Sequence, residues 1–146
     1  MKKLFTLSIL CLAILIAKSQ NQMSLEVVPV QTKHRIVFQL TTADTAIHRM
    51  MVKNISNIKS IATDAEIEVV CHGPGITFLM KEKTIVHDKI TQLKEKGVNF
   101  VGCEFTLKEK GIKKSEIVIE AGFVQSGALE IVIKQEQGWS YLRATN

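Results

Sequence analysis

The sequence has few of the residues that break or cross-link a chain. Among its 146 residues are two prolines and three cysteines, and aromatic residues make up 5%. So few prolines, with no low-complexity stretch, argue against a disordered or linker-rich protein. The sequence also has no glycine-rich phosphate loop and no serine-nucleophile elbow, and its histidines and cysteines lack metal-ligand spacing. We therefore expect neither a metal site nor a cofactor.

The first 19 residues have the pattern of a signal peptide. Lys2 and Lys3 precede an uncharged apolar run over residues 4–17, and Ala17-Lys18-Ser19 offers small residues for cleavage. The run is shorter than the ~20 apolar residues that span a bilayer, so we expect no stable membrane anchor. Cleavage after Ser19 would give a periplasmic or secreted protein.

The basic charge of the chain belongs largely to this leader. Loss of Lys2, Lys3 and Lys18 lowers the formal net charge from +5 to +2. The remaining lysines alternate with glutamates, as in residues 81–83, which is typical of solvated helix faces. We therefore expect no nucleic-acid partner.

Strands and helices alternate along the rest of the chain. After an N-terminal arm at 20–33, a single domain is expected at 34–146. The pattern predicts strands at 34–40, 65–71, 98–102, 115–118 or 120, and 139–144. It predicts helices from a Thr41-Thr42 cap to about 61, from about 84 to 97, and from 103 to 110. Residues 126–137 fit a strand by composition and a helix by the Ser126 cap, and periodicity does not decide. This alternation predicts an α/β fold with a mainly parallel sheet covered on both faces.

Cys103 is the main candidate for chemistry. It closes the apolar run 98–102 and precedes the charged stretch 104–110, so it should lie at the carboxyl end of a strand. Ligands bind at that edge of an open α/β sheet, and a helix N-terminus favours the thiolate. Glu104 opposes this effect, because an adjacent negative charge raises the pKa of a thiol. The alternative is a cysteine retained for packing.

Three further features lie at the same predicted edge. Cys71 ends the preceding strand, so it could form a disulfide or a redox pair with Cys103, although Val-Val-Cys is also typical of a core. His72 could act as a base or hydrogen-bond donor beside Cys103, or be a surface histidine. The loop Gly73-Pro74-Gly75 could present backbone N–H groups to a small ligand, or be a structural turn.

Together these motifs resemble the DsrE/DsrF-like family over residues 34–144. The resemblance rests on His72-Gly73-Pro74-Gly75, on Gly97-Val98 with Cys103, and on Ser126-Gly127 followed by QEQGWSY at 135–141. The family includes YchN-like proteins and the sulfur-relay proteins of tRNA thiolation and dissimilatory sulfur oxidation. The resemblance implies a three-layer α/β/α domain with a mainly parallel sheet of about five strands. It also implies a helix at 126–137 and assembly into homotrimers or hexamers.

The resemblance also implies a function. In relay members a cysteine after a central strand carries a persulfide, and Cys103 matches that position. We therefore expect an exported sulfur-handling protein that binds or carries sulfur at Cys103, with a sulfur donor or acceptor protein as partner. The leader is a departure, because relay proteins work in the cytoplasm. The alternative is a non-catalytic homo-oligomeric module that binds a small ligand or a protein.

The predicted leader can be tested by expression in a bacterium that has a periplasm. Removal of 19 of the 146 residues should leave a product of 127 residues that begins at Gln20. Intact mass and N-terminal sequencing of the periplasmic fraction check this. A Leu10→Arg variant, with a charge in the apolar run, should stay uncleaved. Retention of the natural sequence in the cytoplasm at full length would contradict the prediction.

Overall fold

The structure, a computed structural model, describes residues 33–145. The predicted leader at 1–19 and all but the last residue of the predicted arm at 20–33 lie outside the described residues. Within 33–145, no helix is both long and apolar enough to cross a membrane.

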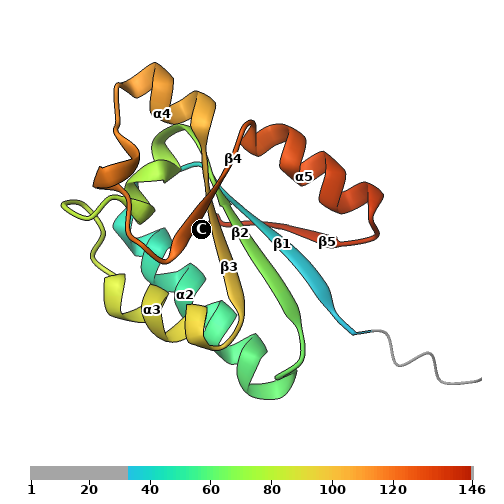
Figure 1. The fold of residues 1–146 in the computed structure, drawn as a ribbon. Helices are drawn as coiled ribbons and strands as arrows, with labels where there is room; N and C mark the ends of the chain where they lie inside the picture. The colour runs from blue at the N-terminus through green and yellow to red at the C-terminus, as the bar shows by residue number, and fades with distance from the viewer. Residues whose placement is uncertain (1–32, 146) are drawn as a thin grey trace, which may run out of the picture. The chain divides into compact units, whose positions relative to one another are not determined.

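A five-stranded parallel sheet forms the centre of the described domain (Figure 1). Its strands are β1 (Arg35–Leu40), β2 (Glu66–Cys71), β3 (Val98–Cys103), β4 (Ala121–Val124) and β5 (Ser140–Arg143). Their order across the sheet is β4-β3-β2-β1-β5, so the chain steps outward from β1 to β4 and then returns to the far side of β1. The predicted α/β class and parallel sheet are confirmed.

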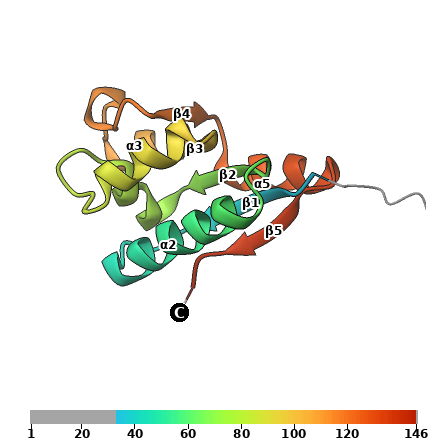
Figure 2. The same ribbon diagram turned by 90° about the horizontal axis from the view of Figure 1, so that it is seen from below.

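Helices cover both faces of the sheet (Figures 1 and 2). Helices α2 (Thr45–Ile61) and α3 (His87–Glu95) lie on one face, and α5 (Gly127–Glu136) lies on the other. The short helix α4 (Glu104–Lys110) and the 3-10 helix η1 (Gly73–Leu79) follow the carboxyl ends of β3 and β2. The helix that the family resemblance implied at 126–137 is therefore present.

Local side-chain contacts fix the ends of the helices. Asp44 is the N-cap of α2, because its carboxylate accepts a hydrogen bond of 2.7 Å from the Ala46 N–H. The cap thus lies later than the predicted Thr41-Thr42, and the Thr42 hydroxyl instead accepts from the Asp44 N–H. At the other end, the buried Lys59 ammonium donates to the Thr63 carbonyl. This hydrogen bond offsets the cost of burying the charge.

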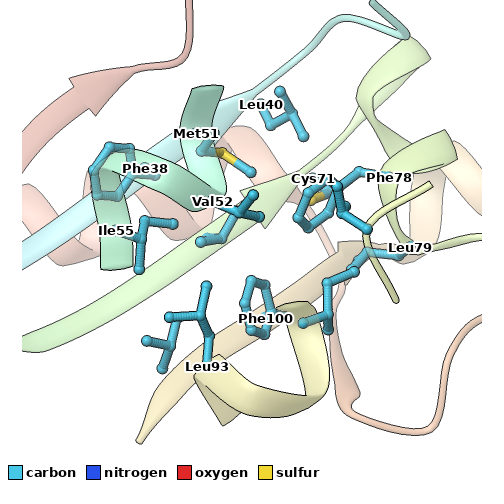
Figure 3. Close-up of a cluster of buried hydrophobic side chains, with 14 of the residues drawn as sticks. Phe38, Leu40, Met51, Val52, Ile55, Cys71, Phe78, Leu79, Leu93 and Phe100 are labelled. Atoms are coloured by element: carbon cyan, nitrogen blue, oxygen red, sulfur yellow. The ribbon is translucent and has the colours of Figure 1, made fainter. Parts of the chain in front are cut away.

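The two faces of the sheet carry cores of different size. Successive side chains of a strand point to opposite faces, so alternate residues belong to different cores. The larger core lies under α2 and α3, and Figure 3 shows ten of its residues labelled, among them Phe38, Leu40, Cys71, Phe78 and Phe100. The smaller core, on the α5 face, consists of Val37, Val70, Val101 and Ile131.

The strand predicted at 115–118 or 120 is wrong. Lys114–Glu116 forms a 3-10 helix, and the fourth strand begins later, at Ala121. Ile117 and Val118 are each 2% exposed, and Ile117 makes only an isolated antiparallel bridge to Met80. Their apolar side chains pack into the larger core from a loop. Ala121 and Gly122, in the actual strand, are weak strand formers.

The approach of η1 to β1 leaves no room for a side chain at Gly75. A Cβ there would lie 2.1 Å from the Leu40 carbonyl oxygen, far inside van der Waals contact. Gly75→Ala should lower the free energy of unfolding by about 3 kcal/mol, because backbone must move to relieve the overlap. Urea unfolding measures the change.

Gly122→Ala is the matched control for this prediction. A Cβ at Gly122 would meet nothing closer than 3.8 Å, so that variant should unfold near the wild-type urea midpoint. Equal midpoints for the two variants would contradict the close approach of Gly75 to β1.

Candidate functional site

The chain connections place Cys103 at the point where the sheet changes its winding direction. After β3 the chain passes into α4, whose Leu107 packs in the core on the α2 and α3 face. After β4 it passes into α5 on the opposite face. Cys103 ends β3 and is paired with Val124, the last residue of β4. Adjacent parallel strands whose connections diverge leave a crevice at their carboxyl ends, which is where such sheets bind ligands.

Cys103 is a nearly buried thiol surrounded by hydrogen-bonding groups. It is 5% exposed, and its Sγ donates to the Gln125 carbonyl at 3.8 Å. Burial raises the pKa of Cys103, but the N–H groups of Gly127, Thr106 and Phe105 and the Thr106 hydroxyl outweigh it, so the pKa is lowered. Both protonation states therefore have partners: the thiol donates to a carbonyl, and the thiolate accepts from N–H and O–H groups.

The charge of Glu104 opposes the thiolate less than its position in the sequence suggests. The Glu104 carboxylate forms an ion pair with Lys114 and is 40% exposed. Solvent and the lysine screen its charge, and the pKa of the Cys103 thiol is lowered despite this neighbour.

The Gly73-Pro74-Gly75 loop acts on the site through Thr106. The Gly73 N–H donates to the Thr106 hydroxyl oxygen at 3.0 Å, and the Gly75 N–H donates to the His72 carbonyl at 3.1 Å. Proline has no N–H, so the loop has none left to present to a ligand, which agrees with the alternative of a structural turn. Because the Thr106 oxygen already accepts from Gly73, its own proton is available for the Cys103 sulfur.

His72 belongs to a hydrogen-bonded chain that crosses three strands. The Tyr141 hydroxyl of β5 donates to Gln39 Oε1 on β1, and Gln39 Nε2 lies 2.9 Å from His72 Nε2, just past β2. The amide nitrogen can only donate, so Nε2 accepts and the neutral ring carries its proton on Nδ1. Burial lowers the pKa of His72, which favours this neutral form.

The His72 ring packs against Gly127, one of the residues whose N–H lowers the pKa of Cys103. A Cβ at position 127 would lie 3.0 Å from His72 Cβ, so a larger residue there would have to displace the His72 side chain slightly. Among the hydrogen bonds of residues 33–145, none joins His72 to Cys103. His72 thus lies at the site through its contact with the start of α5, and no direct bond makes it a base for the thiol.

Cys71 lies on the other face of the sheet. It is fully buried in the larger core, within the cluster of Figure 3, and burial raises its pKa. Its register partner on β3 is Gly102, so the next residue, Cys103, points to the opposite face. Both cysteines are free thiols. The fold therefore does not bring Cys71 and Cys103 together as a redox pair.

Sequence reasoning missed Gln39 and Thr106 as site residues. Gln39 is a polar residue inside the strand RIVFQL, and Thr106 lies in the first turn of a helix, where its hydroxyl can reach the preceding strand end. A polar residue near the end of an otherwise apolar strand can indicate a site residue, but the sequence does not show which residue it contacts.

The described residues form several surface hollows. One, of about 320 Å3, is lined by Phe105, Lys114 and Gln125, so it adjoins the loop that accepts from Cys103. The larger, of about 680 Å3, lies between α2 and the start of α3 and contains no cysteine. Within the described residues, no group of three or more His, Cys, Asp or Glu side chains could hold a metal ion.

Comparisons with known proteins agree with this architecture. The family model described as the DsrE/DsrF-like family matches residues 29–144. The fold is similar to that of MTH1491, a protein of unknown function from Methanobacterium thermoautotrophicum, with a TM-score of 0.72 and 27% identity over 75% of this chain and 98% of that one. It is also similar to BT1422, a conserved protein of unknown function from Bacteroides thetaiotaomicron, with a TM-score of 0.60 and 15% identity over 75% and 93% of the two chains. A search of curated proteins gave no match.

The two cysteines should differ sharply in reactivity. Cys103 should be alkylated by iodoacetamide with a pH midpoint below the ~8.5 of a free cysteine, because neighbouring donors stabilise its thiolate. Cys71 should react only after unfolding, because it is buried. Alkylation rates across pH, with peptide mass mapping, measure both.

Variants at Thr106 separate the donors from simple burial. Thr106→Val removes the hydroxyl and should raise the Cys103 midpoint, whereas Thr106→Ser keeps the hydroxyl and should preserve it. Cys71→Ala should leave the profile unchanged. A Cys103 midpoint at or above that of a free cysteine would contradict the stabilised thiolate.

Proposed function

The chain belongs to the DsrE/DsrF-like family, and we propose that it is a sulfur-handling protein that carries sulfane sulfur on Cys103. The resemblance found in the sequence is thereby confirmed at the level of the family, which suggests a role related to sulfur relay. The observation that carries the proposal is the setting of the Cys103 thiol. It ends β3 beside the divergence of α4 and α5, where donors from both connections favour the thiolate.

A thiolate in this setting can accept sulfur without any cofactor. The Cys103 thiolate attacks the outer sulfur of a donor persulfide, R–S–SH. A new S–S bond forms to Cys103 as the donor S–S bond breaks, and the donor leaves as its thiolate, R–S⁻. One S–S bond replaces another, so there is no net oxidation or reduction. The same N–H and O–H groups that stabilise the thiolate would stabilise the negative charge of the persulfide.

Residues around Cys103 line the proposed site and offer a contact surface for a partner protein. In this proposal His72 and the loop Gly73–Gly75 shape the wall of the site, because His72 packs on Gly127 and Gly73 holds the Thr106 hydroxyl. Phe105, 55% exposed beside the hollow lined by Gln125, offers an apolar contact for a donor or acceptor protein. We further propose that the protein acts outside the cytoplasm as a homotrimer or homohexamer, with partners in that compartment.

One observation favours a different function. Cys103 is only 5% exposed, which suits a packed thiol in a non-catalytic module that binds a small ligand or a protein. Sulfur uptake distinguishes the two functions.

Sulfur uptake can be measured directly by mass. Incubated with glutathione persulfide, the purified protein should gain the mass of one sulfur atom, and a thiol reductant should remove it. The gain should be absent in Cys103→Ala and retained in Cys71→Ala, because Cys71 is buried on the other face. A folded protein whose Cys103 is alkylated but takes up no sulfur would favour the binding module.

A further inference from the structure

A buried charged cluster lies between α5 and the sheet, away from the thiol. The Glu68 side chain, from the middle of β2, is 5% exposed, and its Oε2 lies 3.0 Å from the Lys134 ammonium of α5. Asn99 of β3 donates to the same oxygen at 2.7 Å. The Lys134 ammonium also lies over the Trp139 ring, 4.4 Å from its centroid. Removing two charges from water is costly, so such a pair is poorly explained by stability alone.

The apolar contacts of α5 are too few to fix its position by themselves. Ile131 is the only side chain of α5 in the smaller core, where it meets Val37, Val70 and Val101. The outer side of α5 is also apolar: Leu129 is 56% exposed and Val132 is 47% exposed. Apolar packing is non-directional, so it would permit other rotations of this helix on the sheet. A single buried polar pair can exclude them, because any other rotation leaves Glu68 without its partner.

The position of α5 affects the Cys103 thiol through Gly127, the first residue of the helix. The Gly127 N–H contributes to lowering the pKa of Cys103, and Gly127 also contacts the His72 ring. Lys134 lies seven residues further along the same helix, about 10 Å away at the rise of an α-helix. A helix of this length moves as a unit, so a shift at Lys134 displaces the Gly127 N–H from the sulfur.

We propose that the buried Glu68–Lys134 pair positions α5 on the sheet and thereby sets the reactivity of the Cys103 thiol through Gly127. This inference rests on the proposed function, since it concerns the same thiol. Glu68 and Lys134 are positioning residues: they act on Cys103 only through the placement of α5.

Glu130 completes the cluster. Glu68 Oε1 is buried and has no hydrogen-bond partner among the described residues. On α5, Glu130 Oε1 lies 3.6 Å from the Lys134 ammonium. Burial, with the charge of Glu68, raises the pKa of Glu130. Lys134 thus lies between two carboxylates, one on β2 and one on its own helix.

The chain offers a matched control on the same strand. Glu66 lies two residues before Glu68, on the same face of β2, and pairs with Lys33 at 2.7 Å. That pair is exposed, with 43% of the Glu66 side chain accessible, and it does not involve α5. Glu66→Gln therefore removes an ion pair of β2 without releasing the helix.

The test is the pH dependence of Cys103 alkylation. Glu68→Gln and Lys134→Met should each raise the midpoint by about one pH unit, the size expected for losing one hydrogen bond to a charged group. Lys134→Arg should restore much of the wild-type profile, because a guanidinium can still pair with Glu68. Glu66→Gln should leave the profile unchanged. The double variant Glu68→Gln with Lys134→Met should shift no further than either single variant, because both remove the same contact.

The outcomes separate this inference from the proposed function. Circular dichroism and urea unfolding establish which variants fold. If Glu68→Gln does not fold, Lys134→Met, which keeps the aliphatic stem, decides the test. Folded variants with the wild-type midpoint would overturn the positioning role while leaving sulfur uptake by the wild-type protein intact. A low wild-type midpoint that rises in both variants, without sulfur uptake, would support the positioning role and count against the sulfur carrier.

Discussion

The site depends on the packing of α5 against the sheet face formed by Val37, Val70 and Val101. The chain reaches that face because it reverses direction after β4 and returns across the sheet to β5. The reversal brings the start of α5 beside the end of β3, so one crevice receives N–H groups from two connections. Without that packing, Cys103 would be a cysteine at the end of a buried strand with donors from α4 alone.

Much of the fold could be predicted because it depends on local pattern. Strands rich in apolar and β-branched residues, such as RIVFQL and EIEVVC, are typical of sheets that are buried on both faces. Because predicted helices lie between these strands, a parallel sheet covered by helices follows. The segment at 115–118 has a strand-like sequence because loop residues that pack into the core have the same side chains as a strand. The helix at 127–136 was ambiguous for a related reason, because its β-branched, apolar sequence suits either structure. Its position covering the sheet face opposite α2 and α3 decides for a helix.

The site was predictable in part. Cys103 could be identified because a change from an apolar to a charged pattern marks a strand end. The residues around it could not. Thr106 and Gly127, which face the thiol, and Gln39, which binds His72, come from three separate elements whose meeting depends on strand order. For two neighbours of Cys103, the structure agrees with the alternative that the sequence left open. The loop at 73–75 uses its N–H groups internally, and Cys71 faces away, which depends on the register of β2 against β3.

Under the proposed function, the position of the two thiols on opposite faces of the sheet limits how sulfur can leave Cys103. A cysteine that forms a sulfenic acid or a persulfide is usually regenerated by a second, resolving thiol. Cys71 is fully buried on the opposite face and cannot take that part. Within the described chain, release must therefore come from a thiol on another molecule, through a mixed disulfide or a direct transfer. Under the proposed function, Cys103 would therefore be a one-cysteine centre whose turnover depends on an encounter with a partner.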